Sequence, residues 1–177
     1  MIELDKIAHD VKEAQKNIEK RIVICAGTGC VANGSLKVFD SFRKTAKELG
    51  IAVSVELKEE NKKTNLLTKS GCQGFCQMGP LVNILPDGIL YNKVKPEDVR
   101  EILEASVKDE KVVERLSYHF GDKICKGQSE IPFYTKQHRA VLKQCGVIDP
   151  ENIDEYISDG GYQAAKKACI EMTDKDI

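Results

Sequence analysis

Residues 21–50 read RIVICAGTGCVANGSLKVFDSFRKTAKELG, and this stretch decides the fold class. The apolar run at 21–25 predicts a short buried strand, and a glycine-rich turn follows it. Apolar residues then recur at three- and four-residue steps across 36–49, which predicts an amphipathic helix that ends at Gly50. The alternating pattern at 51–57 predicts a second strand. A strand, a helix and a strand in this order indicate a right-handed parallel crossover.

The rest of the first hundred residues continues an α/β plan. A polar loop at 58–65 precedes a predicted short strand at 66–69. Residues 80–94 predict two strands joined at a Pro-Asp-Gly turn, which is a strong hairpin signal. A helix is expected from 95 to 105, because proline stands in its first turn and acidic residues lie at its positive end. The order β-α-β followed by β-β-α is similar to the thioredoxin-like plan.

The flanking segments divide the chain into four parts. Apolar residues at helical spacing between 4 and 18 predict a helix, which we assign to residues 1–20. The α/β domain is expected at 21–105. Residues 106–130 contain charge runs without a clear period and are interpreted as a linker. Residues 131–177 are expected to be a small helical extension, with short helices at 133–144, 150–158 and 162–172.

The composition excludes several classes of protein. The 27 basic residues do not exceed the 28 acidic ones, so we expect no nucleic-acid partner. No apolar run approaches the roughly 18 residues that span a bilayer, and we expect no membrane insertion. The first twenty residues lack the apolar core of a signal peptide. We therefore expect a cytoplasmic protein, in which seven cysteines indicate metal or redox chemistry more than disulfides.

Four of the cysteines form two close pairs, Cys25 with Cys30 and Cys72 with Cys76. Each pair lies in a loop just after a predicted strand. Strands of one sheet lie about 4.8 Å apart, so loops at the same end of a sheet can bring four sulfurs around one small object. Four thiolates, two for each iron, are what a [2Fe–2S] cluster requires. The pattern therefore predicts an iron–sulfur site on these four residues.

The surroundings of the two pairs favour the same interpretation. No charged residue occurs in 25–36 or in 70–86, although 31% of the chain is charged. Weakly polar walls disfavour the extra negative charge of a reduced cluster, while backbone N–H groups aimed at sulfur oppose that effect. Glycine allows the tight bends that aim such groups, and both loops are rich in it: Gly27, Gly29, Gly34, Gly71, Gly74 and Gly79.

Two alternatives remain open on the residues alone. Zinc is one of them, although structural zinc sites more often use cysteines separated by two residues. The other is that the cysteines are unliganded core residues. Either would make the chain a colourless zinc- or thiol-containing thioredoxin-like module that mediates assembly. The segment GTGCVANG lacks the lysine and the spacing of a phosphate-binding loop, so we reject that function.

The other cysteines and the histidines match no ligand motif. Cys145 and Cys169 are expected to be structural, and Cys125 is the least constrained thiol because it lies in the predicted linker. The isolated histidines are expected to be surface or core residues rather than ligands: His9, His119 and His138.

The lip of the second cysteine loop contains Phe75, Gln77 and Met78. We weigh two roles for it, contact with a partner protein and, for Phe75, shielding of the cluster from water.

With these residues in view, the chain resembles a known family. The motif CAGTGC-x-A-N-G after a strand, followed by GCQGFCQMGPLVNILPDGILYNKV, resembles the thioredoxin-like [2Fe–2S] ferredoxins. More closely, it resembles the ferredoxin domain that begins the NADH-binding flavoprotein subunit of NAD(P)-linked [FeFe]-hydrogenases, including electron-bifurcating ones. The resemblance covers about 21–105. It implies that Cys25, Cys30, Cys72 and Cys76 are the ligands of a [2Fe–2S] cluster that passes single electrons.

The segment at 131–172 extends this resemblance. It is similar to the part of the same subunit, shared with respiratory complex I, that precedes the FMN- and NADH-binding region and a C-terminal [4Fe–4S] site. The resemblance thus implies FMN, NAD(P) and a [4Fe–4S] cluster for a remainder of the subunit. It also implies iron–sulfur and hydrogenase subunits as partners, or those of an NAD-linked formate dehydrogenase or NADH dehydrogenase. We expect the N-terminal piece of a longer subunit rather than a stand-alone variant, with no catalytic, flavin or nicotinamide residue present.

Overall fold

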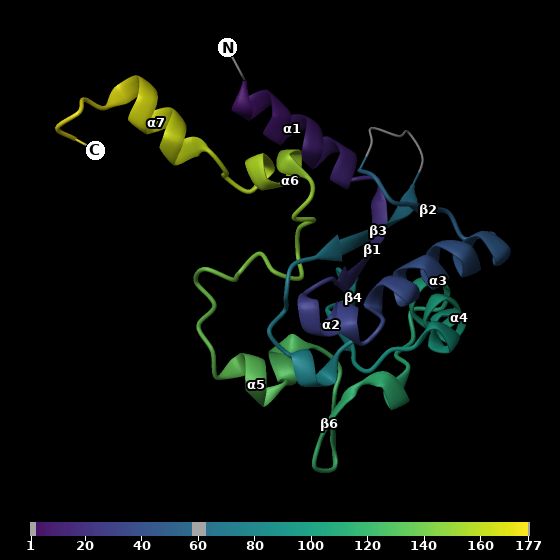
Figure 1. Cartoon of the computed structure of the whole chain (residues 1–177). Helices are drawn as coiled ribbons and strands as arrows, with labels where there is room; N and C mark the ends of the chain where they lie inside the picture. Colours follow the sequence, from purple (N-terminus) through teal and green to yellow (C-terminus); the bar gives the residue numbers. More distant parts are fainter. Residues whose placement is uncertain (1–2, 58–62, 177) are drawn as a thin grey trace.

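A five-stranded sheet with the strand order β2-β3-β1-β4-β5 forms the centre of the protein (Figure 1). The structure is a computed structural model and describes residues 3–57 and 63–176. The first three strands are parallel to one another, and the hairpin β4–β5 joins them with β4 antiparallel to β1. The strands are β1 (Ile18–Cys25), β2 (Val53–Ser54), β3 (Thr64–Ser70), β4 (Val82–Leu85) and β5 (Ile89–Tyr91).

Helix α3 (Ser35–Glu48) packs against β1, β2 and β3. It buries Val38, Phe42 and Ala46, which recur at a spacing of four residues and so share one helix face. Helix α4 (Val99–Ile102) lies beside α3, after the turn η2 (Pro96–Asp98) and before the wider π-helical turn η3 (Leu103–Lys108). The structure confirms the predicted helices of this domain and the hairpin at Pro86-Asp87-Gly88.

The N-terminal boundary differs from the prediction. Helix α1 (Leu4–Gln15) ends before Ile18, and β1 begins three residues earlier than expected. Ile18 pairs with Thr64 of β3, and the register then shifts before Arg21. Residues 18–20 are therefore strand, because β3 supplies hydrogen-bonding partners that the helical spacing of the apolar residues does not reveal.

The second predicted strand is short. Only Val53 and Ser54 pair, and their partner is β3 rather than β1. Strand β3 lies between β1 and β2, so the helix α3 connects parallel strands that are not neighbours. Strand β2 is at the edge of the sheet, where one side has no pairing partner among the described residues, and such strands are commonly short. The loop predicted at 58–65 ends at Thr64, and residues 58–62 lie outside the described residues.

The segment interpreted as a linker is a packed part of the structure. It contains a hairpin of β6 (Tyr118–Phe120) and β7 (Lys123–Cys125), between the turns η4 (Glu114–Leu116) and η5 (Gln128–Glu130). Val113 and Leu116 belong to the main core, and Cys125 is fully buried instead of being an unconstrained thiol. The prediction of a linker was wrong because a few buried apolar residues between the charge runs are enough to anchor the segment.

The C-terminal extension is helical, but its first helix is much shorter than predicted. Helix α5 (Pro132–Thr135) has four residues, and turns follow it as far as Pro150. The Arg139 guanidinium donates hydrogen bonds to the carbonyls of Leu142 and Cys145, in a loop that leaves Val141 almost fully exposed. The later helices, α6 (Ile153–Ser158) and α7 (Gln163–Glu171), lie close to their predicted positions.

The extension crosses back to the N-terminal helix, and α6 packs against α1 (Figure 1). The guanidinium of Arg21, in β1, donates two hydrogen bonds to the buried carboxylate of Glu155, in α6. Within the described residues, no helix combines the length and the apolar character needed to cross a membrane.

Candidate metal centre

Two loops meet at one edge of the sheet. Cys25 is the last residue of β1, and its register partner in the neighbouring parallel strand β3 is Ser70, the last residue of that strand. Parallel strands that end together send their following loops to the same edge. Strand β4, on the other side of β1, starts at this edge with Val82. The loop 71–81 therefore passes from one neighbour of β1 to the other, across the end of β1 itself.

The four predicted ligands come together where these loops cross. Cys30 lies in the short helix α2 (Thr28–Ala32), and Cys76 opens the helical turn η1 (Cys76–Met78). The sulfurs of Cys72 and Cys76 are 3.7 Å apart, and Cys25 and Cys30 lie close enough for each thiol to shift the pKa of the other. The two pairs lie close enough for the charges of Cys25 and Cys76 to affect each other.

Hydrogen bonding polarises the buried pair. The pKa of Cys25 is lowered to about 6, chiefly because the Cys30 thiol donates to its sulfur and also because the N–H groups of Gln73 and Gly27 do so, against the opposing effect of burial. The same hydrogen bond raises the pKa of Cys30, with burial adding to the effect. In the second pair, the hydrogen bond with Cys72 raises the pKa of Cys76. The first pair thus places a thiolate, Cys25, next to a thiol, Cys30.

Glycines allow the two loops to approach this closely. A Cβ atom added to Gly27 would lie 2.7 Å from the Cβ of Cys72, and one added to Gly79 would lie 2.5 Å from the Sγ of Cys30. The contact is reciprocal, because a glycine of each loop faces a cysteine of the other. A side chain at either glycine would push the two pairs apart.

The donor set fits a cluster of two irons. Within the described ranges, no three His, Cys, Asp or Glu side chains surround the position of a single metal ion. The sulfurs instead form two pairs, and a [2Fe–2S] cluster takes two thiolates on each iron. A structural zinc site places four donors around one ion. The N–H of Gly74 donates to the sulfur of Cys72 at 3.4 Å, which is a contact that stabilises a thiolate.

Aromatic rings cover one side of the centre. Phe75 is buried and stacks on Phe133 of α5, with ring centroids 4.6 Å apart and planes 12° apart. Tyr134 meets Phe75 edge-on at 5.6 Å. The burial of Phe75 favours the shielding role over direct contact with a partner, whereas Gln77 remains exposed at the lip.

Sequence reasoning missed residues of the predicted linker and of the extension that belong to this centre. Tyr134 and Cys125 lie in the same buried cluster as Cys25 and Cys30. The Sγ of Cys145 lies within ordinary van der Waals reach of a Cβ added to Gly71, beside the second pair. The adjacent aromatics at 133–134 were the available signal, but nothing local indicates what they cover. The exposed histidines, His9, His119 and His138, join no ligand group.

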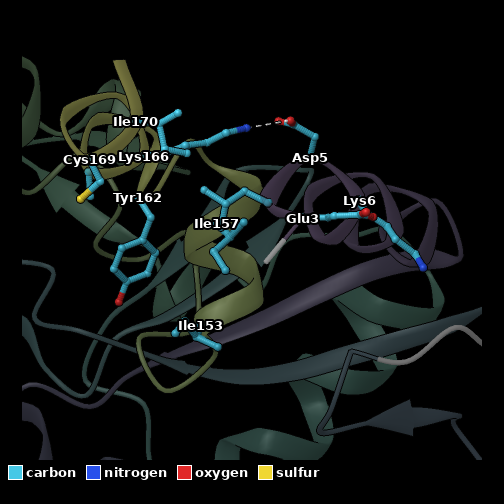
Figure 2. Close-up of a pocket in the computed structure, with 11 residues that line it drawn as sticks. Glu3, Asp5, Lys6, Ile153, Ile157, Tyr162, Lys166, Cys169 and Ile170 are labelled. Atoms are coloured by element: carbon cyan, nitrogen blue, oxygen red, sulfur yellow. Dashed lines mark hydrogen bonds and ion pairs between the residues drawn. The ribbon is translucent and has the colours of Figure 1, made fainter. Parts of the chain in front are cut away.

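A separate apolar groove of about 670 Å³ lies between α1 and the helices α6 and α7 (Figure 2). Its walls include Leu4, Ile153, Ile157 and Ile170, and Lys166 pairs with Asp5 at its rim. Cys169 is the one cysteine among the lining residues, so the groove offers no comparable set of thiols.

Comparison with known proteins adds independent observations. The family model described as thioredoxin-like [2Fe-2S] ferredoxin matches residues 12–107. A "Ferredoxin, 2Fe-2S" of Aquifex aeolicus (strain VF5) is 38% identical over 87 residues, which cover 49% of this chain and 70% of the relative. A "Ferredoxin, 2Fe-2S" of Clostridium pasteurianum is 32% identical over 101 residues, 56% of this chain and 96% of the relative. A solved thioredoxin-like [2Fe-2S] ferredoxin from Aquifex aeolicus aligns with 60% of this chain and 96% of its own, with 31% identity and a TM-score of 0.47.

Proposed function

Because this chain belongs to the thioredoxin-like [2Fe–2S] ferredoxin family, we propose that it carries single electrons on a cluster held by Cys25, Cys30, Cys72 and Cys76. The observation that carries the assignment of ligands is the meeting of two loops, far apart in the chain, at one edge of the sheet. They present four sulfurs as two pairs, and glycines at the crossing leave no room for any other side chain.

The residues around the site have defined tasks in this proposal. When bound, the cluster supplies one-electron redox chemistry. The four thiolates hold it, and the backbone N–H groups of Gln73, Gly27 and Gly74 stabilise negative charge on the sulfurs. Phe75, together with the buried residues behind it, keeps water from one side of the site.

The two cysteine pairs differ in exposure, and this difference indicates where electrons enter and leave. Cys25 and Cys30 are about 1% exposed, whereas Cys72 and Cys76 are exposed at the surface. A redox partner can approach the second pair closely, but the sheet and its covering residues keep it away from the first. We therefore propose that electrons enter and leave past Cys72, Cys76 and the exposed Gln77.

We further propose that the chain works within an NAD(P)-linked multi-subunit oxidoreductase, with the flavoprotein subunit of a hydrogenase as the favoured setting. The similarity of residues 131–172 to that subunit supports this setting. FMN, NAD(P) and a [4Fe–4S] cluster would then belong to neighbouring parts of the complex, and the location would be cytoplasmic. Exposed apolar side chains on the extension, such as Ile153 and Ile170, add support, because larger assemblies commonly cover such residues.

The cluster is tested by anaerobic purification followed by iron and acid-labile sulfide analysis. We expect about two irons and two sulfides per chain, broad visible absorption that dithionite bleaches, and an electron paramagnetic resonance signal in the reduced state. A colourless protein that holds one zinc would overturn the proposal and favour an assembly module.

The wider setting needs a separate experiment. NADH alone should leave the visible spectrum of the purified chain unchanged. Adding a catalytic amount of the flavin-containing component of an NADH-linked hydrogenase should bleach it. A loaded protein that this component does not reduce would count against the setting while leaving the electron-carrier function intact.

A further inference from the structure

Tyr134 brings a polar group from the C-terminal extension into the cluster-binding region. It lies in α5, beyond the residues 12–107 that the family model matches. Nevertheless, its side chain belongs to the same buried cluster as Cys25, Cys30 and Phe75, and the residue is only 6% exposed. The extension therefore adds a residue to a site whose four thiols all come from the ferredoxin segment.

The phenol oxygen of Tyr134 is buried and has no hydrogen-bond partner among the residues that the structure describes. Buried hydroxyl groups nearly always have a partner, because leaving one unpaired loses its hydrogen bonds to water without replacement. Tyr91 differs from Tyr134 in this respect. That tyrosine is also buried, but its hydroxyl bonds with the Ser106 hydroxyl and accepts the N–H of Val113.

Packing of the Tyr134 ring does not require the hydroxyl. The ring forms T-shaped contacts with Phe75 and Phe133, and the Arg139 guanidinium lies 5.6 Å from its centroid. A phenylalanine would make all these contacts. Ring packing therefore does not account for the hydroxyl group at this position.

Electrostatics identifies the neighbours of the phenol. Burial is the main cause that raises the pKa of Tyr134. Arg139 opposes the effect, and the nearby sulfurs of Cys25, Cys30 and Cys72 add to it. Tyr134 packs in one buried cluster with Cys25 and Cys30, and its ring also contacts Phe75, which lies between Cys72 and Cys76 in the second loop. A phenol hydroxyl is a hydrogen-bond donor, and this one is left without a partner among the described residues.

We propose that the Tyr134 hydroxyl donates a hydrogen bond to a sulfur of the bound [2Fe–2S] cluster and thereby raises its reduction potential. This inference rests on the proposed function. Reduction adds a negative charge to the cluster, and a donor directed at sulfur stabilises that charge more than the oxidised state. The extension would then tune the redox centre as well as shield it.

The decisive variant is Tyr134→Phe, which keeps the ring and removes only the oxygen. We expect about a tenfold shift of the redox equilibrium toward the oxidised form, which corresponds to a potential about 59 mV lower for one electron. Anaerobic dye-mediated titration, followed by visible absorption, measures it. The matched control is Tyr91→Phe, which removes a hydroxyl that is bonded within the protein and should leave the potential unchanged.

A second replacement guards against a folding defect. Tyr134→3-fluorotyrosine keeps the donor, barely changes its size and makes the phenol more acidic, so it should raise the potential. Unchanged potentials in both Tyr134 variants, or an equal shift in Tyr91→Phe, would overturn the inference. A wild-type protein without iron would remove the proposed function as well. A fully loaded protein whose reduction potential is unchanged by both Tyr134 replacements would overturn this inference and leave the proposed function intact.

Discussion

Arg21 and Glu155, separated by 134 positions in the sequence, form an ion pair in which one guanidinium nitrogen lies 3.0 and 2.8 Å from the two carboxylate oxygens. The Glu155 side chain is 1% exposed, and its carboxylate also accepts the N–H of Asp149. Arg21 makes a further hydrogen bond to Thr68 of β3. The pair therefore joins the central strand, its neighbour and helix α6 through one buried carboxylate.

Glu155→Gln should lower the free energy of unfolding by about 3 kcal/mol, because it leaves the Arg21 charge largely buried without its counter-charge. Urea denaturation followed by circular dichroism measures the change. The matched control is Glu151→Gln, which breaks an exposed ion pair with Lys69 on the same segment and should cost less than about 1 kcal/mol. Equal losses of unfolding free energy in the two variants would show that the buried ion pair stabilises the fold no more than the exposed one.

Cys72→Ser should remove the visible absorption and most of the iron, because the second pair loses one of its two thiolates. Iron analysis of anaerobically purified protein measures the loss. Cys145→Ser and Cys169→Ser should leave the spectrum unchanged, although Cys145 lies beside Gly71. Loss of iron in Cys145→Ser equal to that in Cys72→Ser would mean that the assigned set of four ligands is wrong.

Gly27→Ala should abolish most cluster binding, because the added Cβ would lie 2.7 Å from Cys72 Cβ and 2.9 Å from its backbone Cα. The second loop would have to move, and its sulfurs with it. Gly71→Ala serves as the control, since its nearest contact, the sulfur of Cys145, would be at an ordinary 3.6 Å. Iron analysis of both variants after anaerobic purification measures the effect. A normal iron content in Gly27→Ala would show that the two loops can move apart without losing the cluster.

Phe133→Ala should leave the iron content of fresh protein unchanged and make the cluster bleach several-fold faster in air. The variant removes the ring that stacks on Phe75 and so opens a route for water and oxygen. The time course of visible absorption after exposure to air measures the rate. Phe120→Ala, at an exposed position of the β6–β7 hairpin, should bleach like the wild type. Identical rates for Phe133→Ala and the wild type would remove the shielding role.

The sequence predicts the elements whose signals are local. The apolar run before Cys25, the helical stripe of α3 and the Pro86-Asp87-Gly88 turn all appear in the structure. The convergence of the cysteine pairs also follows from local signals, because two neighbouring parallel strands that end together bring their loops to one edge.

The features that were missed depend on distant partners. Cys125 lies among charged residues in the sequence, and its burial comes from contacts with the cluster-binding region. Tyr134 and Phe133 cover a loop more than fifty residues earlier in the chain, which no periodicity reveals. The predicted helix at 133–144 is a different case, because it ends at Thr135 and Arg139 donates hydrogen bonds to the nearby carbonyls of Leu142 and Cys145 in the loop that replaces it.

The central place of β1 in the sheet has a consequence for biosynthesis. A ribosome makes this strand first among the five, yet its two neighbours, β3 and β4, are made some forty to sixty residues later. Cys25 and Cys30 are therefore synthesised before the loop that holds Cys72 and Cys76 exists. Iron delivery to the nascent polypeptide must wait until both halves of the binding edge have been translated.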